Sequence, residues 1–422
     1  MNRLFIILIS LSFVSAGIAH WHWNPSSVHL SPMQAMSDEI IATAQNSIML
    51  MINLTGVLCL FLGLTAVGEK AGLLNQLGHL LNPLLIRLFP EVPPHHPAMG
   101  AIGMNLSANM LGLGNAATPF GIKAMQGLNQ LNPHPGYASN SMILFLAINT
   151  SSITLLPIKV IALRAAAGSV NAAGIVPTTL FATLCSTIAA IIVSKILNHS
   201  FRSSPCGTIA SQQNINSDLT SRKADSIWKS ITFIICLVSF IPLTIFLGEK
   251  ITPWLIPSLI TFIIIYGGFK KINVYESFVM GAKEGISVAL NIVPYLLVIM
   301  VAIAMFRSSG LLANFISALS PLTETIGLPA EALPMALLRP LSGSGSFGVL
   351  ADVLNDPNFG PDSYVGYLVS TLMGSTETTF YVLAVYFGSV QIKHLRHALV
   401  PALIADGVAI MSSVFIVSWL FK

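Results

Sequence analysis

A chain of 422 residues is long enough for two or three soluble domains, but its composition excludes that class. Hydrophobic residues make up 54% of the sequence and charged residues 9%, which is too little charge to cover a soluble protein of this size. The net charge of +4 comes from 20 basic and 16 acidic residues, a balance that indicates membrane topology and not a nucleic-acid-binding surface. The four cysteines have no metal-ligand spacing, so we expect them to be packing residues.

The first apolar run covers residues 4–19 and follows a single basic residue, Arg3. Its 16 residues are fewer than the roughly 20 that span a bilayer. Two interpretations therefore stay open: an uncleaved membrane helix, or a signal peptide cleaved near Gly17-Ile18-Ala19. The segment His20-Trp21-His22-Trp23 that follows is typical of an aromatic anchor at the membrane interface, which we prefer to a metal site.

Further apolar runs predict an all-α, polytopic membrane protein with about nine transmembrane helices. They occupy about 47–67, 138–162, 173–198, 228–247, 251–270, 287–308, 364–388 and 400–421. Two other apolar stretches, 71–90 and 310–328, carry several polar residues and end at Pro90 and Pro329. They predict amphipathic or half-membrane helices.

The stretch Asn105–Phe120 places Gly, Asn, Ser, Thr and Pro inside an apolar chain. Gly112, Gly114 and Pro119 interrupt the helical pattern, so we expect a broken helix that enters the membrane and returns. Freed backbone groups at that depth must be buried in protein or line a wet cavity, which makes the stretch a candidate site. The alternative is a close helix contact made through small residues.

The sequence repeats itself with an offset of 238 positions, which lays Ser37–Pro83 on Tyr275–Pro321 without a gap. Beyond this, Asn105–Asn109 matches Pro340–Ser344, and the Ser/Thr-rich segment Asn149–Thr154 matches Gly374–Thr379. Broken segments paired in two halves of a chain indicate a transporter site.

Basic residues predict the orientation of the two halves. The loop 20–46 contains no Lys or Arg and is expected outside, whereas the polar segment 199–226 and its basic flanks are expected in the cytoplasm. Under this count the second repeat is inverted relative to the first. We predict a first repeat at 1–198, a flexible linker at 199–226 and a second repeat at 227–422.

No motif predicts an enzyme, because the sequence offers no nucleophile with its base, no phosphate loop and no metal-ligand cluster. We expect no cofactor and no metal centre. The most informative ionisable residue is Glu377, which lies among Ser and Thr residues at membrane depth. It could bind a cation, a proton or a substrate amine, or it could only form an ion pair with Arg339. Lys159 and Arg164 are expected near the membrane interface, with their charged ends in water.

Four motifs also resemble a known family. Residues 109–121 and 149–164 resemble spore maturation protein A, and residues 339–350 and 374–389 resemble spore maturation protein B, so the chain is similar to a fusion of the two. The resemblance implies membership of the nucleoside recognition, or Gate, family, which is related to concentrative nucleoside transporters and the ferrous iron transporter B. It implies an uncleaved first helix and a membrane protein of transporter type, but it supplies no substrate.

The sequence therefore predicts a multi-pass protein of the plasma (inner) membrane that moves a small polar or charged solute through a midplane site between two inverted Gate-type repeats. The alternative is a non-transporting membrane factor in envelope or spore maturation. The expected partners are a small-molecule or ion substrate and the lipid bilayer, without nucleic acid; a homo-oligomer is compatible with the sequence. The predicted site residues are Asn105, Ser107, Asn109, Asn115, Thr118, Asn149, Thr150, Ser151, Ser152, Ser342, Ser344, Ser346, Ser375, Thr376, Glu377 and Thr378.

Overall fold

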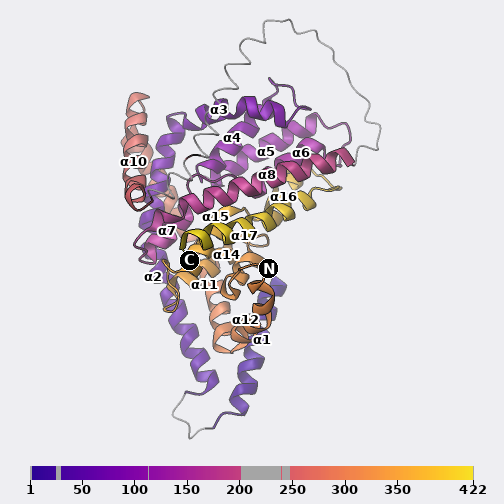
Figure 1. Cartoon of the computed structure of the whole chain (residues 1–422). Coiled ribbons are helices and arrows are strands. Elements are labelled where there is room, and N and C mark those ends of the chain that lie inside the picture. Colours follow the sequence, from indigo (N-terminus) through magenta and orange to yellow (C-terminus); the bar gives the residue numbers. More distant parts are fainter. Residues whose placement is uncertain (1, 25–29, 113, 201–238, 240–247, 422) are drawn as a thin grey trace, which may run out of the picture.

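The computed structural model describes residues 2–24, 30–112, 114–200, 239 and 248–421. Within these ranges the regular structure is helical, apart from an isolated bridge between Tyr137 and His394 (Figure 1). The helices are α1 (Asn2–Trp21), α2 (Pro32–Lys70), α3 (Leu73–Leu88), α4 (Pro97–Met110), α5 (Gly114–Gln130), α6 (Asn140–Ser151), α7 (Ile158–Ala166), η1 (Ala172–Ile175), α8 (Val176–Ser200), α10 (Gly248–Phe269), α11 (Val274–Ser308), α12 (Leu311–Glu324), η2 (Ala330–Ala332), α13 (Leu333–Leu338), α14 (Gly343–Asn355), α15 (Tyr364–Ser375), α16 (Thr379–Ser389) and α17 (Leu399–Phe421).

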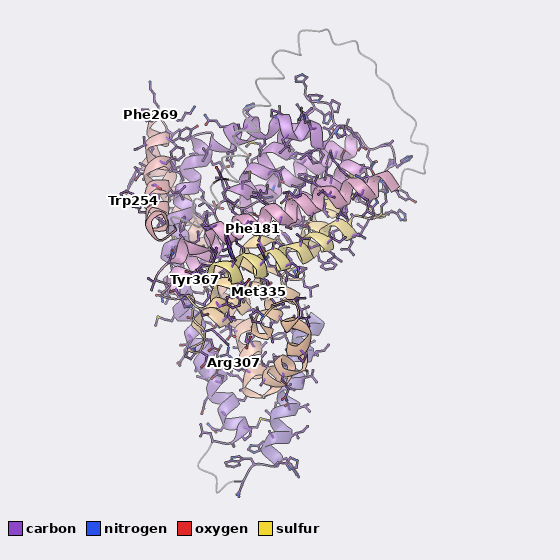
Figure 2. All side chains as sticks on the ribbon, viewed as in Figure 1. Phe181, Trp254, Phe269, Arg307, Met335 and Tyr367 are labelled. Carbon is purple, nitrogen blue, oxygen red and sulfur yellow. The ribbon has the colours of Figure 1, made fainter. Side chains whose placement is uncertain are left out.

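Three helical stretches in the described part are long and apolar enough to cross a membrane: Pro32–Lys70, Ala172–Asn198 and Leu399–Phe421. Side chains on α10 support the same environment, because Trp254 and Phe269 are 71% and 83% exposed at the edge of the molecule (Figure 2). Large apolar side chains in such positions suit contact with lipid. The predicted all-α polytopic membrane fold is confirmed. Most of the apolar run 228–247 and most of the linker 199–226 lie outside the described residues.

Two long helices, α2 and α11, pack along each other and form the spine of the molecule (Figure 1). They have 39 and 35 residues, so at about 1.5 Å per residue each is longer than the roughly 30 Å of a bilayer core. Glycines allow their close approach: a Cβ on Gly281 would lie 2.3 Å from the carbonyl oxygen of Leu62. Helix α1 packs against α11 and α2.

The two halves share local geometry as well as sequence. Helices α3 and α12 each follow a glycine in the left-handed region, Gly72 at φ +83° and Gly310 at φ +75°. Helices α6 and α15 each begin after a serine cap, Ser139 and Ser363, with the same φ of −75° and ψ of 163°. The internal repeat read from the sequence is therefore present in the backbone.

The structure differs from prediction at 138–162 and 364–388, which were expected to be continuous spans. Each is divided into two helices, α6 and α7 in the first case and α15 and α16 in the second. The divisions fall in the Ser/Thr-rich segments, where hydroxyl groups compete for backbone partners, and Pro157 adds a residue without an N–H. With the interruptions after α4 and α13, the protein has four helix breaks of interest, at 111–112, 152–157, 339–342 and 376–378.

Candidate functional site

The four helix breaks meet at a cavity of about 550 Å³. Its wall combines apolar side chains with polar ones from both halves of the chain, and its volume suits a small organic solute. The polar and charged residues that line it are Asn109, Thr118, Asn149, Thr154, Lys159, Arg339, Ser342, Ser344, Glu377, Thr378, Tyr381 and Tyr386.

Backbone hydrogen bonds join the breaks to one another. The N–H of Leu155 donates to the carbonyl oxygen of Met110 at 2.8 Å, and the N–H of Glu377 donates to the carbonyl oxygen of Thr150, also at 2.8 Å. The N–H of Phe380 donates to the carbonyl oxygen of Pro340 at 3.1 Å. Each bond satisfies groups that a broken helix leaves free at membrane depth. The bond between Glu377 and Thr150 also ties the second half of the chain to the first.

A network of amides and one phenol forms the polar side of the cavity. The Asn109 amide donates to Asn149 Oδ1 at 2.9 Å, and the Tyr386 hydroxyl donates to the same oxygen at 3.3 Å. Behind them, the Asn105 amide donates to Tyr386 Oη at 3.1 Å and to the Ala117 carbonyl at 2.8 Å. The Asn149 side chain also donates to the Phe145 carbonyl at 2.9 Å. These bonds fix the orientation of the groups that a solute would meet.

Arg339 and Glu377 form an ion pair in the wall, with Arg339 Nη2 3.8 Å from Glu377 Oε2. The Arg339 guanidinium also donates to the Thr376 carbonyl and, at 3.2 Å, to Thr378 Oγ1. The two side chains differ in environment, because that of Arg339 is 8% exposed and that of Glu377 is 46% exposed. The carboxylate therefore faces the cavity and can contact a ligand, whereas the guanidinium is held mainly by protein.

The cavity contains about half of the residues predicted for the site. Asn109, Thr118, Asn149, Ser342, Ser344, Glu377 and Thr378 line it. Other predicted residues are buried behind its wall, and several of their hydroxyls bond to the backbone of their own helix, as Ser107 does to Gly103 at 2.7 Å and Ser346 does to Ser342 at 2.8 Å. The residues placed outside the lining are Asn105, Ser107, Thr150, Ser151, Ser152, Ser346, Ser375 and Thr376. The side chain of Asn115 lies outside the described part.

Sequence reasoning missed the aromatic residues of the site. Tyr381 and Tyr386 lie on α16 and line the cavity. An aromatic residue in an apolar run carries no local signal, and Tyr386 gains its role only because the fold brings it to Asn105 and Asn149. Lys159, expected at the interface, also lines the cavity.

Arg164 was expected near water but is fully buried. Its guanidinium lies 3.0 Å from an oxygen of Asp362, donates to the Pro361 carbonyl at 2.6 Å and sits 4.2 Å from the ring centroid of Tyr367. The prediction that its charged end reaches water is wrong, because α7 ends against the loop before α15, which supplies a carboxylate and a carbonyl. Arg164 therefore fastens the first half of the chain to the second.

A buried acid near the site, Asp406, was not predicted. It lies on α17, is 4% exposed, and accepts a hydrogen bond from the Thr379 hydroxyl at 2.6 Å. The signal for it was present, because an acid in the apolar run 400–421 is costly at membrane depth and so marks a functional position.

A multi-pass helical protein whose broken helices converge on a polar cavity has the architecture of a transporter-like membrane protein. The model of the nucleoside recognition (Gate) family matches residues 51–167 and 289–393, so the family model covers both halves. The chain belongs to the nucleoside recognition (Gate) family.

Two curated relatives of Bacillus subtilis (strain 168) agree with this assignment. Spore maturation protein B is 47% identical over 176 residues, which cover 41% of this chain and 98% of the relative. Spore maturation protein A is 46% identical over 163 residues, which cover 39% of this chain and 83% of the relative. The predicted resemblance to both proteins is confirmed. Among solved structures, an outward-facing CNTnw variant aligns with a TM-score of 0.47 and 13% identity over 99% of each chain.

Proposed function

We propose that this protein moves a small polar or charged solute across the plasma (inner) membrane through the cavity between its two halves. The observation that carries the proposal is the convergence of the four helix breaks on one cavity of about 550 Å³ with an acid, a base and fixed amides in its wall. Irregular backbone at membrane depth is tolerated where it lines such a cavity. A cavity built from both halves of the chain suits a site that opens alternately to the two sides of the membrane.

The groups in the wall suit a solute that carries hydrogen-bond donors and acceptors together. Asn109 and Asn149 offer amides, Glu377 accepts from hydroxyl or amine groups, and Arg339 favours an acceptor or a negative charge. The first turn of α14, with Gly343 and Ser344 in the lining, adds the positive end of a helix dipole. A nucleoside is the first candidate within this class, since it presents hydroxyls and base edges and agrees with the description of the family.

The transport cycle follows from the predicted domains. The repeats at 1–198 and 227–422, joined by the linker 199–226, rock against each other around the cavity. Because the second repeat is inverted, the conformation open to the outside and the conformation open to the cytoplasm have similar contacts and so similar free energies. Arg164 and Asp362 lie at a contact between the two halves and would act as a fixed point of this motion.

The alternative function is a non-transporting membrane factor in spore or envelope maturation. The observation in its favour is that the two curated relatives are named for spore maturation and together match much of this chain. In that case the cavity would be a structural feature, and no small solute would stabilise the folded protein.

Solute-induced stabilisation of the purified protein separates the two functions. Ligand that binds the folded state raises the apparent melting temperature by mass action. The screen covers nucleosides, amino acids, dicarboxylates and divalent metals, followed by uptake of any hit into proteoliposomes. Ser344→Ala should weaken the effect because Ser344 lines the cavity, whereas the matched Ser317→Ala, on the exposed face of α12, should not. A melting temperature that no solute class raises would favour the function in spore or envelope maturation.

A further inference from the structure

The buried acid Asp406 has only part of its hydrogen-bonding capacity satisfied. Thr379 donates to Oδ2 at 2.6 Å, whereas Oδ1 is buried and has no hydrogen-bond partner among the described residues. A charged carboxylate accepts several hydrogen bonds, so an unpartnered oxygen at 4% exposure is costly at this depth. The cost falls if that oxygen carries a proton or meets a water.

A small cavity beside Asp406 connects it to the arginine of the proposed solute site. The cavity has a volume of about 10 Å³ and is lined by Asp406, Arg339, Ser375 and Thr376, among others. This volume holds about one water and is too small for a hydrated metal ion. Arg339 lines the large cavity as well, and the charges of both Glu377 and Asp406 act on its guanidinium.

The charges of the three groups that act on one another do not balance. Two carboxylates, Glu377 and Asp406, share one cation, Arg339, which leaves this group of three with a net charge of −1 if both acids are ionised. Lys159 also lines the large cavity, but it is not among the groups that act on Asp406. Among the described residues, Arg339 is the charged group that acts on Asp406. Thr379 of α16 supplies a hydroxyl, and Ser186 of α8 donates to the Ala405 carbonyl. One proton restores neutrality. Glu377 is 46% exposed and keeps its hydration, so the proton belongs on Asp406.

We propose that Asp406 is a proton-binding site that acts on the solute site through Arg339. Protonation forms an O–H bond at Asp406 with a proton taken from water, and Arg339 is then left to pair with Glu377. Loss of that proton to water restores the carboxylate, which attracts Arg339 and weakens its pairing with Glu377. Glu377 then becomes free to bind a donor group of a solute. The link to solute binding rests on the proposed function, whereas the proton site itself does not.

Infrared difference spectra of the full protein, recorded between acidic and neutral pH, test the proton site without any solute. A protonated Asp406 adds one titrating carboxylic C=O component to those of the other acids of the protein. This component is the difference between the spectra of the unmodified protein and those of Asp406→Asn, whose amide has the shape of the protonated acid, and it should remain in the control Asp38→Asn, on the exposed start of α2. Thr379→Val should keep the component but move it to higher frequency, because Asp406 loses its hydrogen bond. Identical carboxylic bands in the unmodified protein and in Asp406→Asn would overturn the proposal, and so would a component that Thr379→Val leaves at the same frequency.

Solute binding as a function of pH tests the coupling. For any solute that stabilises the unmodified protein, the dissociation constant should change several-fold across the titration of the band, and this change should vanish in Asp406→Asn. A band without any solute binding would leave the proton site standing and count against the proposed transport function. Binding whose pH dependence is identical in Asp406→Asn would overturn the coupling while leaving the transport function in place.

Discussion

The guanidinium of Arg339 lies 3.8 Å from the carboxylate of Glu377, yet the two partners are held very differently. Arg339 has further acceptors in Thr376 and Thr378, so it remains bonded to protein if Glu377 leaves. Glu377 is nearly half exposed, and its side chain lines the cavity. Glu377 can therefore leave the ion pair to contact a solute, while Arg339 stays hydrogen-bonded to the protein.

Glu377→Gln should lower solute binding and leave stability almost unchanged. A half-exposed ion pair contributes less than about 1 kcal/mol, and Arg339 keeps its other acceptors. Thermal unfolding and solute binding are measured on the same variant, with Glu276→Gln on the exposed start of α11 as the control. Destabilisation of about 3–5 kcal/mol, as for a buried charge left unpaired, would show instead that the pair is structural.

Arg164→Met should destabilise the folded protein strongly. The change leaves the Pro361 carbonyl, Ser370 and Asp362 without their common donor in a site where Arg164 is fully buried. We expect a loss on the order of 3 kcal/mol, measured by thermal or denaturant unfolding in detergent. Arg87→Met, on an exposed position of α3, removes the same charge and should have little effect. Equal free energies of unfolding for Arg164→Met and Arg87→Met would show that Arg164 does not stabilise the contact between the two halves.

Gly281→Ala should separate the two spine helices. The added Cβ would lie 2.3 Å from the Leu62 carbonyl oxygen and 2.9 Å from Gly63 Cα, so backbone must move. Overpacking of this kind costs about 1–3 kcal/mol. Gly56→Ala is the matched control on α2, because a Cβ there meets nothing within 4 Å and alanine favours a helix. A melting temperature for Gly281→Ala at or above that of the unmodified protein would contradict the close packing of α2 and α11.

The sequence predicted the parts of this fold that depend on local chemistry. Glycine and proline mark the breaks near Gly112 and Pro340, and the offset of 238 positions identifies α3 and α12, each preceded by a left-handed glycine. It missed the breaks after α6 and α15, because their neighbours are apolar enough to resemble one continuous span. The roles of Tyr386 and Arg164 depend on partners more than 190 positions away, and no local pattern contains that information.

His397 should make stability depend on pH. It lies in the turn before α17, and its Nε2 is 2.8 Å from Asn198 Oδ1 at the end of α8. Burial lowers the pKa of His397 below its ordinary value of 6.5, and the charge of Arg396 lowers it further. The unfolded chain therefore binds the proton more readily than the folded protein, so stability rises with pH in the interval between the two values. The contribution is complete above pH 6.5 and is lost as the pH falls to the folded pKa.

Comparison of variants isolates this contribution. His397→Gln keeps a donor toward Asn198 but has no proton to gain, so its melting temperature should fall less than that of the unmodified protein as the medium is acidified from pH 6.5. His134→Gln, at an exposed position, should follow the unmodified protein. Parallel curves for His397→Gln and the unmodified protein would assign the acid sensitivity to another group.

Reporter fusions test the orientation on which the inverted repeats depend. The loop 20–46 has no Lys or Arg, whereas basic residues flank the linker 199–226, so the positive-inside rule places the two segments on opposite sides. A reporter at Ser31, just before α2, should be active in the periplasm, and one at Gln212 should be active in the cytoplasm. A third at Asn358, in the loop between α14 and α15, and a fourth at Asn132, between α5 and α6, should fall on opposite sides because these loops occupy equivalent places in the two repeats. The same side for Asn132 and Asn358 would mean that the repeats are parallel, and the two-sided opening of the cavity would then need a different motion.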